Sequence, residues 1–131
     1  MIDIEDQVFN AVYPFIEPLV PVGCFTSEYT PTPAALPYAY LSEIDNVPDR
    51  KTADSGTHEW SCILTYEAQM FAYSKPEVKA IAMAMDEAMI GLMGFHKTQG
   101  QYIPNATDVN VYRYVARYER GVDRMGNLYR A

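Results

Sequence analysis

The sequence contains few of the residues that build metal sites and nucleophilic active sites. Its 131 residues include two cysteines and two histidines. His58 and His96 are far apart, so they do not form the pair of histidines at i and i+4 that binds metals on helices. Gly91 and Gly94 lie at the end of a predicted helix, not between a strand and the start of a helix, so they form no phosphate loop. We therefore expect no metal, no cofactor, no catalytic residue and no enzymatic activity.

The two cysteines, Cys24 and Cys62, both fall in predicted strands. No signal peptide or transmembrane run precedes them, which favours buried, reduced thiols in a cytosolic compartment. A cysteine nucleophile activated by a histidine is the alternative, but a position inside a strand argues against it.

Positive charge is also scarce, with 10 Lys and Arg against 17 Asp and Glu and a net charge of −7. A protein that grips DNA or an anionic membrane needs a basic surface. We therefore expect neither activity. An acidic protein can still line a passage through which DNA slides, because weak contact is then an advantage.

The length fits one domain, residues 1–131, and 49% hydrophobic residues indicate a folded core. The strongest pattern begins at Thr57, where apolar residues alternate with polar ones as in a strand with one buried face. The mostly apolar positions are the even-numbered ones, which we call the apolar parity: His58, Trp60, Cys62, Leu64, Tyr66, Ala68, Met70 and Ala72. A strand of this length is unusual in a small sheet, so we expect part of its hairpin to project as an arm or to carry a bulge.

A capping box, Ser74 with Glu77, predicts a helix that runs to about Leu92 and stops at Gly94. Its predicted core stripe is Val78, Ile81, Ala82, Met85, Met89 and Leu92. Met83 and Ile90 lie on another flank, seven residues apart. They are either isolated surface residues or a contact for a partner subunit.

The remaining elements follow from spacing and from turn residues. Asp3 is the expected N-cap of a first helix whose stripe is Ile4, Val8, Ala11, Val12 and Phe15, and Pro14 should end or kink it near Tyr13. Further strands are expected at 24–29, 38–45, 95–103 and 109–119, the last with Tyr112, Tyr114, Ala116 and Tyr118 on its core side. Residues 121–131 read as a flexible or partner-ordered tail. The order αβββαββ predicts an α+β fold of two layers, with two helices on one face of a mainly antiparallel sheet of four to five strands.

Charged residues suggest surfaces for assembly. Asp49, Arg50, Lys51 and Asp54 cluster at the tip of the long hairpin, which is either a solvated loop or a tip that docks on a neighbour. Arg113 and Arg117 project from one face of the last strand. They either pair with glutamates of the long strand or face a subunit boundary or lumen.

The chain resembles the tail terminator, or tail completion, proteins of long-tailed bacteriophages. The likeness runs nearly end to end, and its weight comes from the order and spacing of loose similarities. They lie in residues 2–9, 23–37, 54–56, 90–95, 103–105 and 111–118. The chain departs from these proteins in Pro14, in Pro18 and in its acidic balance.

The resemblance implies a virion subunit that is assembled in the host cytoplasm and forms a hexameric ring at the tail–neck junction. Such a ring caps the head-proximal end of the tail tube, stops tube polymerisation and joins the head's connector or neck proteins, while genomic DNA passes through its centre. Two alternatives stay open. One is a head-completion or neck connector ring. The other is a small α+β enzyme or binding module with a ligand pocket between its helices and its sheet.

Overall fold

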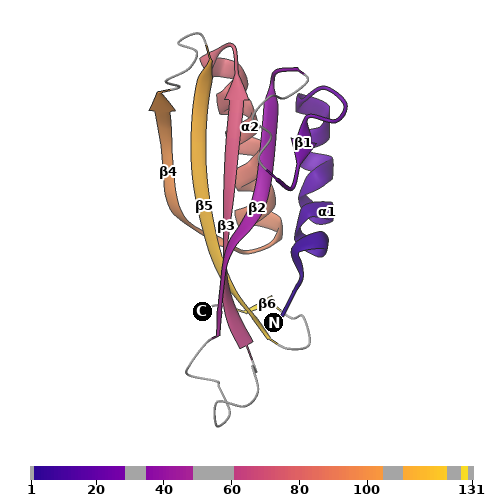
Figure 1. Cartoon of the computed structure of the whole chain (residues 1–131), viewed down its shortest axis with the longest axis vertical. Coiled ribbons are helices and arrows are strands. Elements are labelled where there is room, and N and C mark those ends of the chain that lie inside the picture. The colour runs from indigo at the N-terminus through magenta and orange to yellow at the C-terminus, as the bar shows by residue number, and fades with distance from the viewer. Residues whose placement is uncertain (1, 29–34, 49–60, 105–110, 124–127, 130–131) are drawn as a thin grey trace.

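The computed structural model describes residues 2–28, 35–48, 61–104, 111–123 and 128–129. Two helices lie on one face of a single sheet (Figure 1). The elements are α1 (Glu5–Ile16), the 3-10 turn η1 (Glu17–Leu19), β1 (Phe25–Thr26), β2 (Tyr38–Pro48), β3 (Ser61–Ala72), α2 (Lys75–Asp86), the π-helical η2 (Glu87–Leu92), β4 (His96–Pro104), β5 (Tyr112–Asp123) and β6 (Leu128–Tyr129). The α+β class and the order of the main elements are confirmed.

The strand order is β1-β2-β3-β5-β4, and β6 pairs with the far end of β5. Every pairing is antiparallel except the short one between β1 and β2. The two 12-residue strands, β3 and β5, are therefore central. In Figure 1, β4 forms one lateral edge of the molecule, and α1 with β1 lies at the other.

The alternation in β3 predicts its inner face correctly. All six described residues of the apolar parity are buried: Cys62, Leu64, Tyr66, Ala68, Met70 and Ala72. In β5, Ala116 and Tyr118 stand opposite Ala68 and Tyr66 and are also buried. The predicted core side of β5 does not extend to Tyr112, which is 45% exposed near the start of the strand. Both helices bury their apolar stripes against this face in one hydrophobic cluster.

The capping box of α2 is confirmed. The Ser74 hydroxyl donates a hydrogen bond to Glu77 Oε1 at 2.9 Å, and the Glu77 N–H donates to Ser74 Oγ at 3.4 Å. The predicted stripe is buried as far as Met89, but Leu92 is 57% exposed, so its assignment to the core is wrong. The π-helical turn η2 holds one more residue than an α-helical turn, so Met93, which is partly buried, packs against the core in place of Leu92. Gly94, with φ of 71°, ends the helix as predicted.

Pro14 is expected to end or kink the first helix near Tyr13; it does not end the helix, because α1 continues to Ile16. Proline removes only one backbone donor, and the Glu17 N–H still donates to the Tyr13 carbonyl. Ile16 is fully buried, and its packing holds the last turn. The expected N-cap, Asp3, is also wrong: α1 begins at Glu5 and its N-cap is Ile4, although the Asp3 carboxylate accepts from the Glu5 N–H at 3.1 Å.

The C-terminal prediction needs a correction too. Residues 121–123 continue β5, and Leu128 pairs back with Val122, so these residues are not a flexible tail. The strand expected at 24–29 shrinks to Phe25–Thr26 among the described residues. The β2–β3 hairpin and β5 continue beyond the ends of both helices (Figure 1), as an arm requires, while the tip at 49–60 lies outside the described residues.

Candidate functional site

The sheet face opposite the helices carries an ordered polar network on three strands. Register places Ser42, Glu67 and Arg117 side by side, and Tyr40 stands opposite Gln69 two positions along, on the same face. The Glu67 carboxylate is its centre. Glu67 Oε1 accepts from the Tyr40 hydroxyl and from Gln69 Nε2, both at 2.8 Å, and Glu67 Oε2 accepts from Arg117 Nε at 3.1 Å.

The network changes the acidity of its members. Burial by itself raises the pKa of Glu67, but the hydrogen bonds from Gln69, Tyr40 and Arg117 outweigh it and lower the pKa below its usual value. Burial and the neighbouring carboxylate together raise the pKa of the Tyr40 phenol. Glu67 is therefore ionised and Tyr40 neutral at neutral pH, and the face carries a fixed pattern of charge.

Arg113 and Arg117 contact their own chain. Arg117 Nη2 lies 3.0 Å from Glu67 Oε2, and Arg113 Nε donates to Gln69 Oε1 at 2.8 Å. The Arg113 guanidinium also lies 5.6 Å from the centre of the Phe71 ring. Pairing with a glutamate of the long strand thus holds for Arg117, while Arg113 pairs with an amide. A contact of either arginine with a subunit boundary or a lumen stays a prediction.

The outer face is less wet than the sequence suggests. Gln69, Phe71 and Val115 are buried there, at 7%, 9% and 4% exposure. A second, smaller hydrophobic cluster includes residues of this face and residues of the segment that follows α1. The cluster consists of Cys24, Tyr38, Tyr40 and Phe71, with Val20, Leu36 and Val111 packed against it.

Met83 and Ile90 lie on the solvent side of α2 and η2, at 67% and 43% exposure. Their place outside the core agrees with the sequence, and a partner contact there stays a prediction. The tip residues Asp49, Arg50, Lys51 and Asp54 lie outside the described residues.

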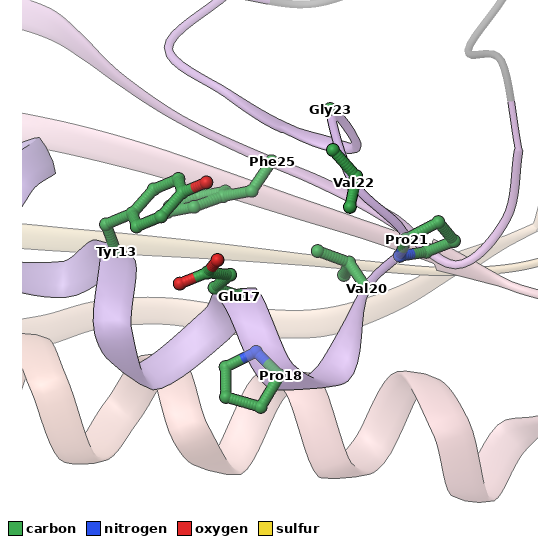
Figure 2. A pocket seen from close by; sticks show the side chains of 8 residues that line it. All are labelled: Tyr13, Glu17, Pro18, Val20, Pro21, Val22, Gly23 and Phe25. Carbon is green, nitrogen blue, oxygen red and sulfur yellow. The ribbon is translucent and has the colours of Figure 1, made fainter.

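A surface depression of about 360 Å³ lies where α1 passes into η1 and the chain turns towards β1. Figure 2 shows the side chains of Tyr13, Phe25, Val20 and Val22 around it, with the Glu17 carboxylate beneath the Tyr13 ring. The Tyr13 and Phe25 rings stack with centroids 5.9 Å apart. This depression is at the end of α1, whereas the ligand-binding alternative places its pocket between the helices and the sheet.

A further polar cluster, which sequence reasoning missed, fixes α2 to the sheet. Asp86 accepts from the Tyr118 hydroxyl at 2.6 Å and from Lys97 Nζ at 3.0 Å, and Lys97 also donates to the Tyr114 hydroxyl at 2.8 Å. Tyr118 is fully buried, so these bonds satisfy groups that have left water. The arrangement is a structural anchor.

Sequence reasoning also missed Tyr40, Glu67 and Gln69 as members of one outer network. The signal was present, because polar residues of β3 recur at every second position and two arginines follow the same period on β5. What the sequence lacks is the register that sets Arg117 opposite Glu67.

The described residues contain no group of three or more His, Cys, Asp or Glu that could hold a metal ion. Cys24 and Cys62 are both buried thiols. His96, on the edge strand, lies 3.9 Å from the Glu119 carboxylate and is mostly exposed. Within the described part of the chain, no helix is long and apolar enough to cross a membrane.

No protein-family model and no curated protein matches the chain. Among solved structures, the chain is similar to one chain of the virion of a native gene transfer agent (GTA) particle. The TM-score is 0.59 at 14% sequence identity, and the likeness covers 88% of this chain and 88% of that chain. At this identity the comparison shows a shared fold.

Proposed function

We propose that the chain is a structural virion protein that forms a hexameric ring and terminates a phage tail. The observation that carries the proposal is the likeness of fold, along 88% of both chains, to a chain of a gene transfer agent virion. The likeness to tail terminator proteins in the order of their motifs supports the finer role. A ring of this kind caps the head-proximal end of the tail tube and presents the surface that joins the neck.

The described surface supports an assembly role. Among the described residues, eleven large hydrophobic side chains are exposed, including Met83, Ile90 and Leu92 on α2 and η2, and Tyr102 and Tyr112 near one end of the sheet. Single exposed apolar residues are common, but residues that share one surface mark contacts with other proteins. A ring buries such residues when copies associate.

The charge of the protein suits a passage for DNA. A net charge of −7 repels phosphates, so a lumen built from this chain holds DNA weakly and lets it pass. The partners in this proposal are further copies of the chain, the tail tube protein and the neck proteins. Genomic DNA passes through the ring without sequence-specific binding.

A head-completion or neck connector ring is the second candidate, because the same likeness to a virion chain supports it. The two roles differ in the partner. A terminator binds the end of a tail tube and stops its growth, whereas a connector ring binds the head and leaves tube growth unchanged.

The test is the solution mass of the purified protein, measured by light scattering over a concentration series, with and without tail tubes. A hexamer, alone or on tubes, together with tubes that stop growing, is the expected result. A hexamer that leaves tube growth unchanged favours the connector. A monomer that ignores tubes contradicts both ring functions.

A further inference from the structure

One lateral edge of the molecule carries charge of a single sign. The sequence contains 10 Lys and Arg, and all of them follow Asp49. The elements before that point, α1, η1, β1 and β2, contain or adjoin only acidic charges: Asp3, Glu5, Asp6, Glu17, Glu28, Glu43 and Asp45. Since α1 and β1 lie at one lateral edge and β4 lies at the other (Figure 1), one edge of the protein is purely acidic among its described residues.

The depression at the end of α1 belongs to this acidic edge. It combines one carboxylate, that of Glu17, with the aromatic faces of Tyr13 and Phe25 and with Val22, which is fully exposed. No described residue forms an ion pair with Glu17 or donates to its carboxylate. A carboxylate beside aromatic rings suits an ammonium group on an apolar stem, that is, a lysine side chain. We call this depression the acidic pocket.

The opposite edge presents such a side chain. Lys75, the first residue of α2, lies with its Nζ 5.0 Å from the centre of the Tyr102 ring of β4. Tyr102 and Tyr112 are 43% and 45% exposed, and Tyr73 beside them is 63% exposed. We call these four residues, Tyr73, Lys75, Tyr102 and Tyr112, the tyrosine–lysine edge.

The other described basic residues are less available than Lys75. Lys97 binds Asp86, Arg117 binds Glu67, Arg113 binds Gln69, and the Arg120 guanidinium donates to the Met93 carbonyl. Lys79 also has no ion pair among the described residues, but it lies one turn further along α2, and no aromatic contact ties it to the β4 edge.

The two surfaces also stand at the same height. The end of α1 and the C-terminal end of β4 lie near the same end of the long axis, on opposite sides (Figure 1). A closed ring repeats one head-to-tail contact between two different surface patches. If the two patches lie at the same position along the ring axis, each copy follows the last without a shift along that axis, and the ring can close. We propose that the tyrosine–lysine edge of one copy docks on the acidic pocket of the next copy, with Lys75 paired with Glu17. This contact rests on the proposed ring.

The test is a charge swap. Glu17→Lys and Lys75→Glu should each lower the ring's association constant at least tenfold, because each places two like charges at every contact. The double variant should recover most of that loss. Both changes suit the isolated fold, because a cation is favoured at the C-terminal end of α1 and an anion at the first turn of α2. Asp45→Lys and Lys79→Glu are the controls, with the same charge changes outside the contact, and both should assemble like the wild type.

Carbodiimide cross-linking of the wild-type ring gives a readout that needs no variant. An amide between Lys75 and Glu17 of different copies, found by mass spectrometry, is the expected product. Single variants that assemble normally, together with rings whose cross-links omit this pair, overturn the contact and leave the ring standing. A wild-type protein that never assembles overturns the contact and the proposed function together.

Discussion

Replacing Glu67 with glutamine should cost more stability than its place on the outer face suggests. Every neighbour of this carboxylate is a donor: the Tyr40 hydroxyl, Gln69 Nε2 and the Arg117 guanidinium. Gln69 cannot turn its amide to help, because its Oε1 already accepts from Arg113. The NH₂ group of a glutamine at position 67 therefore meets a donor in either orientation.

The magnitude follows from these bonds. Hydrogen bonds to a charged group contribute about 1.5–3 kcal/mol each, and the glutamine retains part of this through its one carbonyl oxygen. The Arg117 side chain is 44% exposed, so its ion pair adds only about 0.2–1 kcal/mol. The expected loss in the free energy of unfolding is about 2–3 kcal/mol at neutral pH. For a domain of this length, that lowers the Tm by roughly 6–12 °C.

The loss should depend on pH in one direction. The pKa of Glu67 is lower in the folded protein than in the unfolded chain, so its contribution is complete above the unfolded value of about 4.3. The contribution disappears as the pH falls through the folded pKa, because a protonated Glu67 resembles glutamine. The difference between wild type and variant should therefore shrink between about pH 5 and pH 3, whatever other groups do to both proteins.

Urea unfolding at several pH values measures this difference directly. Glu87→Gln is the matched control: Glu87 is exposed on η2, no described residue pairs with its carboxylate, and its replacement should change stability by less than about 0.5 kcal/mol. A Glu67→Gln difference that is equally small, or one that stays constant down to pH 3, would refute the reasoning.

Three further experiments test other parts of the protein. Ser74→Ala should destabilise the protein by about 1 kcal/mol in thermal unfolding, because the Glu77 N–H loses its cap acceptor. Leu92→Glu should leave the Tm nearly unchanged while Met93→Glu lowers it, because the π-helical turn packs Met93 against the core; the reverse order would contradict the turn. Met83→Glu with Ile90→Glu should preserve the circular dichroism spectrum but weaken assembly in light scattering, and unfolded protein would place these residues in the core instead.

The sequence predicts those features that depend on one element alone. The inner face of β3 follows from a period of two, and the start of α2 follows from the Ser74 capping box, so both are confirmed. Features that depend on packing between residues far apart in the sequence cannot be predicted in this way. Nothing near Pro14 in the sequence shows that a buried Ile16 will hold the helix beyond the proline. Likewise, the sequence does not predict that η2 is π-helical: Gly91 weakens an α-helix there but does not specify a π-helical turn.

The candidate surfaces divide in the same way. Exposure of Met83 and Ile90 could be predicted, because a helix has one period and one buried stripe. The network around Glu67 could not, because it needs the register of three strands. The polar parity of β3 suggests a wet face, yet Gln69 and Phe71 are buried there, because their partners come from residues far away in the sequence.

A charged side chain that already has partners within its own chain contributes to stability, whereas one without such partners is available for assembly. On the outer face, Arg117 and Glu67 complete each other's bonds within one chain, so a partner there has to displace bonds that already exist. At the lateral edges, no described residue donates a hydrogen bond to the Glu17 carboxylate or forms an ion pair with it. Among the described residues, Lys75 Nζ contacts only the Tyr102 ring. A contact between copies would therefore form new ion pairs at the lateral edges, whereas on the outer face it would have to replace bonds within the chain. Glu67→Gln should therefore lower the Tm of the monomer, and Glu17→Lys should leave that Tm unchanged and weaken the ring.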